Sequence, residues 1–215
     1  MKKVVNPTSK YVSPSETYWE ITGVKYKGNL HTYRLSDKMT EPMNQNKLAE
    51  FYEKEKQKGN PYPLDSILHF SIFDSAVKSG NKDLMNLIQS GLRKYPNTLS
   101  RVIYNPLSKD NVIHNYGTSD VYSLNGDVIG EDGWITNINN KKSLELLTGI
   151  KDIKKLNKIS QGVNQTQMGL WRVSSKPSEK IERVVRFDDY GGGLGLSAGG
   201  LPSGVFPAFL VEKVD

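Results

Sequence analysis

The stretch that most constrains this chain is a run of small residues close to its C-terminus, from Gly191 to Gly204. The segments on either side of it, residues 184–187 and 209–211, are apolar and rich in residues that favour strands, so both are predicted strands. Glycine-rich sequence between two strands indicates an irregular backbone or positions where side-chain bulk is not needed. We therefore expect this segment to be held by a sheet while presenting little bulk of its own.

Within this run, Leu194 and Leu196 alternate with small residues. If the segment is extended, the two leucines point to one face, and Gly193, Gly195 and Ser197 point to the other. We therefore expect the leucines to anchor the segment in a core and the small residues to be displayed outward.

The rest of the chain predicts an α+β fold. Residues 18–26 and 30–35 are expected to form a hairpin around a turn at residues 27–29. Apolar stripes predict helices over residues 47–58 and 65–79, and a further helix capped by Asn81 that ends before Pro96. Short helices are expected at residues 143–147 and 152–159, and a strand at residues 169–173. Residues 97–140 look mostly irregular, apart from a strand at 99–104 and a tight turn at 125–127.

Size and composition predict one soluble domain. A chain of 215 residues without internal repeats or long linkers favours a single domain over residues 1–215. Because the chain has no cysteine, disulfides and thiolate metal sites are excluded. The given sequence has no stretch of the apolar length needed for a secretory signal or a membrane span, so we expect no membrane insertion.

The net charge of +6 does not favour nucleic-acid binding. Residues 161–215 carry six basic and six acidic side chains, so all of the excess lies in residues 1–160. Much of it is Lys interleaved with Glu, as in residues 53–58, which is typical of a solvated helix face. We therefore expect no nucleic-acid partner.

No constellation of residues in the sequence predicts catalysis. The three histidines, His31, His69 and His114, are far apart, and His69 lies in a strongly apolar helix, where a core position is expected. Residues 193–198 match a dinucleotide-binding fingerprint, but the prolines that follow leave no room for the helix it requires. Asp188 and Asp189 offer too few oxygens for calcium on their own. We expect no cofactor and no metal.

The order of motifs in the last 45 residues resembles a known fold. Residues 169–172 read Gly-Leu-Trp-Arg, residues 183–187 read Arg-Val-Val-Arg-Phe, and residues 207–214 read Pro-Ala-Phe-Leu-Val-Glu-Lys-Val. This order resembles the C-terminal part of C-type lectin folds of the formylglycine-generating-enzyme type. Ala208 and Leu210 replace the glycine and arginine of that family's closing strand, and the catalytic cysteines of the enzyme are absent.

The tail resembles more closely a non-catalytic subset of this fold, the variable proteins of diversity-generating retroelements. Their C-terminal segment is rewritten at adenines, largely in Asn-type codons, and forms a ligand-binding surface. Residues 188–206 contain no Lys, Glu, Gln, Met or Trp, and every residue present is reachable from such a codon. The Lys-, Asn- and Ile-rich usage upstream suggests an A+T-rich genome, archaeal or viral.

The resemblance implies a C-type lectin fold: a twisted antiparallel sheet with two main helices, long irregular insertions, and paired N- and C-terminal strands. Its variable region would span about residues 169–209, anchored by buried Trp171, Phe187, Leu194, Leu196 and Phe209. Tyr190 and Phe206 would carry most of the affinity, because aromatic residues dominate binding hot spots. The positions expected to bind ligand are Asp188, Asp189, Tyr190, Gly191, Gly193, Gly195, Ser197, Gly199, Gly200, Gly204, Val205 and Phe206.

The implied function is non-catalytic binding of a protein or cell-surface ligand by a monomer. Two alternatives remain open. An enzyme of an α+β fold would place Asp188 and Asp189 in a deep acidic cleft. A structural virion or surface protein would use the glycine-rich segment for a broad contact between subunits.

Overall fold

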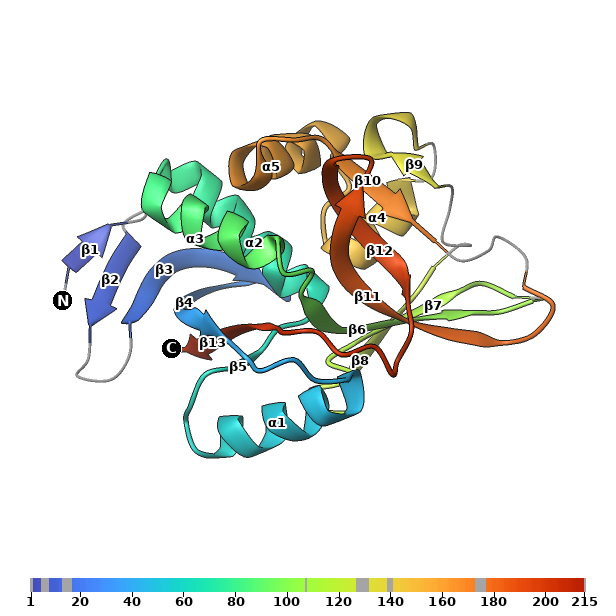
Figure 1. Ribbon diagram of the computed structural model, residues 1–215, viewed down its shortest axis with the longest axis horizontal. Helices are drawn as coiled ribbons and strands as arrows, with labels where there is room; N and C mark the ends of the chain where they lie inside the picture. Colours follow the sequence, from blue (N-terminus) through green and yellow to red (C-terminus); the bar gives the residue numbers. More distant parts are fainter. Residues whose placement is uncertain are drawn as a thin grey trace.

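The computed structural model describes residues 2–4, 8–12, 17–106, 108–126, 132–138, 141–172 and 177–214. Within these ranges the chain forms two β-sheets and five α-helices (Figure 1). The predicted α+β class is confirmed. The prediction of one antiparallel sheet is wrong, because the strands form two sheets and the second contains a parallel pair, β10 (Met168–Trp171) with β12 (Gly193–Gly200).

The first sheet contains the predicted N-terminal hairpin. Lys27 and Gly28 form its turn with φ of +50° and +86°, a backbone that glycine adopts readily. The six strands follow in the order β1 (Lys2–Val4), β2 (Thr8–Val12), β3 (Thr17–Tyr26), β4 (Asn29–Met39), β13 (Phe209–Lys213) and β5 (Tyr62–Pro63).

The C-terminal strand lies inside this first sheet, between β4 and β5. β13 runs antiparallel to β4, with Val211 opposite Leu35, and β5 pairs with its other edge. The predicted pairing of N- and C-terminal strands is therefore confirmed through β4, whereas β1 lies at the outer edge next to β2. Because β13 follows the glycine-rich segment directly, both ends of that segment are held by sheet.

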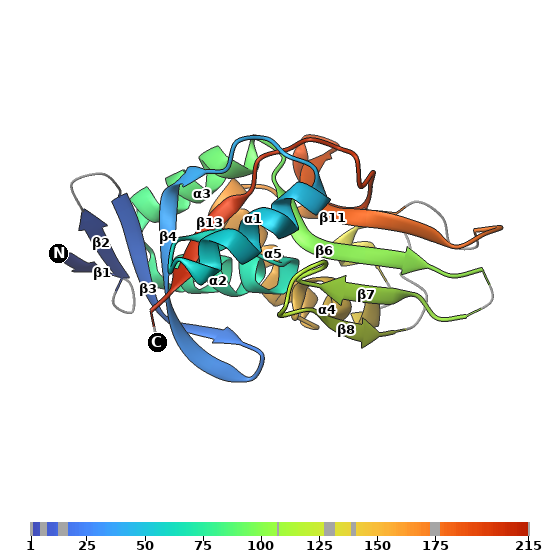
Figure 2. The ribbon, with the colours of Figure 1, turned by 90° about the horizontal axis from the view of Figure 1, so that it is seen from below.

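The second sheet has seven strands. Figure 2 shows four of them, β11, β6, β7 and β8, lying one beside the next. The full order is β8 (Tyr122–Asn125), β7 (Asn111–His114), β6 (Asn97–Tyr104), β11 (Ile181–Tyr190), β12, β10 and β9 (Gly133–Trp134).

Part of the region expected to be irregular belongs to this sheet. Strands β6, β7 and β8 form an antiparallel meander within residues 97–125. Every residue of β6 is buried, so its sequence lacks the polar–apolar alternation of a half-exposed strand. The predicted turn at residues 125–127 lies partly outside the described residues.

All five predicted helices are present. They are α1 (Gln45–Gln57), α2 (Ser66–Ser79), α3 (Lys82–Leu92), α4 (Lys141–Thr148) and α5 (Ile153–Asn164). Helix α1 begins two residues before the predicted start at 47, and α5 extends five residues past the predicted end at 159. The Asp65 carboxylate accepts the N–H of Leu68 at the start of α2, and the Asn81 side chain accepts that of Leu84 in α3. Gly80 ends α2 with φ of +66°, a conformation that favours glycine.

Helix α2 lies between the two sheets and joins their cores. It contacts β3 of the first sheet and β6 of the second, as well as α3, α4 and α5 (Figure 1). The His69 ring of α2 packs at a steep angle against Phe187 of β11 and edge to face against Phe209 of β13, with ring centroids 5.3 and 5.7 Å away. The prediction that His69 is a core residue is confirmed, since only 1% of it is exposed. One hydrophobic core therefore includes residues from both sheets.

None of the helices in the described ranges is both long enough and apolar enough to cross a lipid bilayer.

Candidate functional site

The candidate site lies on one face of the second sheet, around the β11–β12 hairpin. Residues that pair directly across neighbouring strands point to the same side of a sheet. On the side away from the core, the register brings together Arg186, Asp188 and Tyr190 of β11, Gly193, Gly195 and Ser197 of β12, Gly169 and Trp171 of β10, and Trp134 of β9. We call this set the outer face.

The hairpin is closed by two glycines. Tyr190 pairs with Gly193, leaving Gly191 and Gly192 as a two-residue loop with φ of +55° and +83°. Two-residue hairpin loops of this kind require positive φ at both central positions, which glycine adopts without a Cβ clash. Gly191 is exposed, but its identity is explained by the turn.

The opposite face of the hairpin anchors it to the core, as expected. Phe187, Leu194 and Leu196 are almost completely buried, and Phe209 of the following strand is buried with them. The prediction that Trp171 belongs to this buried set is wrong: its side chain lies on the outer face and is 45% exposed. Trp171 follows buried Leu170 in β10, so strand alternation turns its indole away from the core.

Aromatic rings of the outer face lie over glycines of β10 and β12. An added Cβ would lie 2.9 Å from the Trp134 ring at Gly193, 2.1 Å from the Tyr190 ring at Gly169, and 1.9 Å from the Trp171 ring at Gly199. The Trp134 and Tyr190 rings also meet edge to face, with centroids 5.1 Å apart. These glycines therefore leave room for the rings above them.

The expected outward display of the small residues is wrong in one respect. Gly193, Gly195 and Ser197 do point away from the leucines, but all three are buried. At Gly195 a Cβ would lie 2.9 Å from the backbone oxygen of Asp188, and at Gly200 it would lie 3.0 Å from that of Val184. Backbone atoms cannot swing aside as a side chain can, so these two positions are tightly constrained.

Seven residues enclose a hollow of about 260 Å³ on the outer face. Five of them were predicted as ligand-binding positions: Asp188, Asp189, Tyr190, Gly195 and Ser197. The other two lining residues, Trp171 and Arg186, are not among the predicted ligand-binding positions. The alternation of side chains along each strand could have identified them, but only once the strand register is known. In that register both Trp171 of β10 and Arg186 of β11 pair with Ser197 of β12.

Arg186 connects the hollow to the segment that follows β12. Its Nη2 donates to the Asp188 carboxylate at 2.6 Å, and its guanidinium carbon lies 4.3 Å from the centre of the Phe206 ring. The Arg186 Nε is buried and has no hydrogen-bond partner in the part of the chain that the structure describes. The side chain is thus fixed between an anion and an aromatic face, while one donor remains unused.

The two aspartates have different local partners. Asp188 binds Arg186, whereas Asp189 accepts the N–H of Gly192 at 3.1 Å and thereby supports the hairpin turn. Asp189 pairs with Leu194, so it is on the side of the hairpin that faces the core. It is nevertheless exposed, because it lies close to the end of the strand. The two carboxylates do not form an isolated acidic pair.

The remaining predicted positions lie along the segment after β12. Gly204 donates its N–H to Leu201 at 2.9 Å in a turn, and Val205 is 56% exposed. Phe206 forms a β-bridge with Met43, which ties the segment to the stretch before α1. Leu201, 60% exposed, adds a second apolar side chain to this surface.

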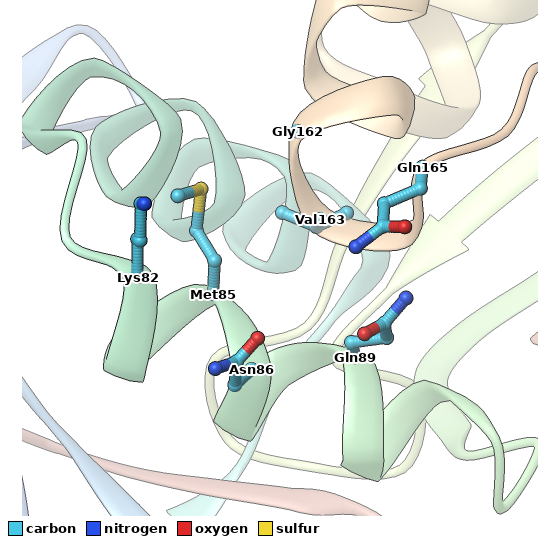
Figure 3. Close-up of a pocket in the computed structure, with 7 residues that line it drawn as sticks. All are labelled: Lys82, Met85, Asn86, Gln89, Gly162, Val163 and Gln165. Carbon is cyan, nitrogen blue, oxygen red and sulfur yellow. The ribbon is translucent and has the colours of Figure 1, made fainter.

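A separate groove of about 360 Å³ lies between α3 and α5, away from all of the predicted positions. Figure 3 shows Gln89 of α3 and Gln165 at the end of α5 on its two sides. Lys82 is its one charged lining residue, and the others are amide or apolar side chains or glycine. Gly162 allows the close approach of Val77, since an added Cβ would lie 2.4 Å from it. The groove therefore reflects helix packing.

Within the described ranges, no three His, Asp or Glu side chains come close enough together to hold a metal ion. Comparison of the chain with protein-family models, with curated proteins and with solved structures gives no match.

Proposed function

We propose that this protein is a non-catalytic binding protein whose ligand contacts the outer face. The observation that carries the proposal is the hollow where the exposed Trp171 indole, the Tyr190 phenol and the Arg186–Asp188 pair converge. Trp, Tyr and Arg are the residues most enriched at binding hot spots. A hairpin anchored by buried leucines holds these groups in place before any ligand arrives.

The charge distribution favours binding over catalysis at this site. Asp188 is engaged by Arg186 and Asp189 by a backbone amide, so neither carboxylate is placed as a free acid or base. Arg186 is the one basic residue among those lining the hollow, against two acids. The local charge is therefore unsuited to a phosphate backbone, and we propose no nucleic-acid partner.

The shape of the site favours a large ligand. Enclosed small-molecule sites usually have volumes of about 300–1,000 Å³, and the hollow of about 260 Å³ is smaller than these. The exposed Leu201 and Val205 extend the apolar surface beyond it. We propose that a monomer uses this surface to bind a protein or another cell-surface macromolecule.

We further propose a C-type lectin fold for the chain. Three features support it. Helices α2 and α3 come after the N-terminal hairpin, with α1 and β5 between them and the hairpin. Strands β6, β11 and β12 form an antiparallel trio, and β13 returns to pair with β4. In this fold the end of the chain is fixed by the sheet. A segment between fixed ends can then present side chains without loss of the core.

The resemblance to variable proteins of diversity-generating retroelements leads us to propose that residues 188–206 vary among copies of the gene. The contacts of the segment restrict where variation is tolerated. Accessible side chains are found at Asp188, Tyr190, Val205 and Phe206. A side chain at Gly195 would instead meet backbone atoms, and other residues of the segment face the core. Variation should therefore concentrate at positions with accessible side chains and spare Gly195 and the residues that face the core.

Sequencing many copies of the gene from one population tests the proposed variation. We expect nucleotide differences to concentrate at adenines of a template repeat that encodes residues 188–206, with Leu194, Leu196 and Gly195 unchanged. Differences spread evenly over the gene would contradict it.

The binding function is tested by screening the intact protein against a glycan array and a phage-displayed peptide library. We expect saturable binding of at least one class that the double substitution Asp188→Ala with Phe206→Ala abolishes. Binders indifferent to this double variant, or a stable oligomer that buries Trp171, would contradict the proposal.

A further inference from the structure

A second cavity, unrelated to the outer face, lies beside the N-terminal hairpin. Its volume is about 490 Å³, which is within the usual range for small-molecule sites. The hairpin β3–β4, helix α1, strand β5 and the loop after β7 all contribute to its walls. Four of its lining residues are tyrosines, Tyr26, Tyr33, Tyr52 and Tyr62, so we call it the tyrosine cavity.

The inner wall of the tyrosine cavity is fixed by a buried carboxylate. Asp65 is fully buried and accepts hydrogen bonds from the hydroxyls of Tyr26 and Tyr122. Asn115 donates to the Tyr26 hydroxyl at 3.3 Å. Burial, together with the nearby Asp65 charge, raises the pKa of Tyr26, so its phenol remains protonated and keeps its donor role.

An aromatic pair forms another part of the wall. The rings of Tyr52 and Tyr62 meet edge to face with centroids 4.9 Å apart. The Tyr52 hydroxyl donates to Asp120, which also binds the Lys56 ammonium. Burial raises the pKa of Tyr62 to about 12, so this phenol is neutral at physiological pH. The wall therefore offers π faces held in a fixed arrangement.

The charge around the tyrosine cavity is positive. Lys27, Lys56 and Lys213 line it, against one lining carboxylate, Asp120. Asp120 is already engaged by Lys56. The Lys27 ammonium lies 3.8 Å from the centre of the Tyr122 ring, and neither Lys27 nor Lys213 forms an ion pair within the described ranges. Even with buried Asp65 counted, one positive charge remains in excess.

We propose that the tyrosine cavity binds a small anion that carries a planar ring. The ring would lie against the tyrosine walls, and the anionic group, a phosphate or a carboxylate, would face Lys27 and Lys213. Tyrosine faces favour planar rings, and ammonium groups without a carboxylate partner favour an anion. This inference does not depend on the function proposed for the outer face, since the two sites share no lining residue.

Calorimetric titration of the whole protein with four probes tests the inference. Adenosine monophosphate and indole-3-acetate each carry a ring and an anion, adenosine carries only the ring, and inorganic phosphate only the anion. We expect saturable binding of at least one of the first two, at least about tenfold tighter than adenosine or phosphate. If only the monophosphate binds, the anionic group that faces the lysines is a phosphate. If only indole-3-acetate binds, that group is a carboxylate.

The matched variants are Lys27→Gln and Lys25→Gln. Both residues are exposed lysines of the same hairpin, but Lys25 does not line the cavity. We expect Lys27→Gln to weaken the tighter probe about tenfold and Lys25→Gln to change it less than about twofold. Equal losses in the two variants, equal affinity for adenosine and its monophosphate, or no saturation by any probe at millimolar concentration would overturn the inference.

Discussion

The Trp171 indole lies so directly over Gly199 that a Cβ added to the glycine would fall 1.9 Å from a ring carbon. The glycine thus determines where the largest exposed side chain of the outer face can lie. Gly169 under Tyr190 and Gly193 under Trp134 repeat the relationship on neighbouring strands. Small residues in this sheet and aromatic rings above them form one structural unit.

Gly199→Ala should move the Trp171 indole away from the sheet. Because Trp171 is 45% exposed, its ring can swing into solvent, and we expect a loss of stability below about 1 kcal/mol. Iodide quenching of tryptophan fluorescence should increase, because Trp19 is buried and Trp134 lies over Gly193, where the substitution does not displace it. Ser203→Ala, in the exposed turn after β12, is the control and should leave quenching unchanged. Unaltered quenching in Gly199→Ala would contradict the close approach.

Gly195→Ala should cost more stability than Gly199→Ala. Its Cβ would meet the Asp188 carbonyl oxygen at 2.9 Å and the carbonyl carbon at 3.2 Å, so the paired strands must shift. We expect a loss of about 1–3 kcal/mol in the free energy of unfolding, measured with urea. Ser197→Ala on the same strand is the control. Serine already carries a Cβ, so this substitution adds no atom and should lose less stability. A neutral Gly195→Ala would show that the hairpin adjusts freely.

Leu196→Ala tests the anchoring of the hairpin. Leu196 is fully buried in the main core, so its truncation should destabilise the protein by about 2–5 kcal/mol. Leu201→Ala removes the same atoms from a side chain that is 60% exposed and should change stability by less than about 0.5 kcal/mol. Similar losses in the two variants would mean that Leu196 does not anchor the hairpin in the core as described.

Protonation of His69 should destabilise the protein in mild acid. Burial lowers the pKa of His69 to about 4 from 6.5, so the unfolded chain binds this proton at a higher pH than the folded one. The stabilising contribution is therefore complete above pH 6.5 and is lost as pH falls toward 4. Between pH 7 and pH 5 the loss from His69 should be about 2 kcal/mol.

Urea unfolding of the wild type and of His69→Phe at both pH values measures this effect. The wild type should lose more stability in acid than the variant does. The variant should retain some acid sensitivity, because burial also lowers the pKa of His114. The same pH dependence in both proteins would contradict the assignment to His69.

Sequence patterns were sufficient for the helices and insufficient for the site. Apolar stripes and caps such as Asp65 and Asn81 are local signals, so the five helices could be predicted. The parallel pairing of β10 with β12 depends on contacts between distant segments, which no local pattern specifies. Trp171 was therefore assigned to the core, although the register of β10 turns it outward.

The glycines of β12 show the same limit. Their frequency indicated positions that need no side-chain bulk, which is correct. Whether the free space faces solvent or lies under a ring depends on Trp134, Tyr190 and Trp171, which come from three different strands. The expectation of outward display was wrong at Gly193 for this reason, since the Trp134 ring covers it.

The most direct test of the outer face compares two exposed hydrophobic residues on different sheets. Peptides selected from a phage-displayed library on the wild-type protein are titrated against Trp171→Ala and against Leu30→Ala, where Leu30 is 70% exposed on the N-terminal hairpin. If the outer face is the binding surface, most peptides should lose at least about tenfold in affinity with Trp171→Ala and less than about twofold with Leu30→Ala. Equal effects of the two substitutions, or losses confined to Leu30→Ala, would contradict the account.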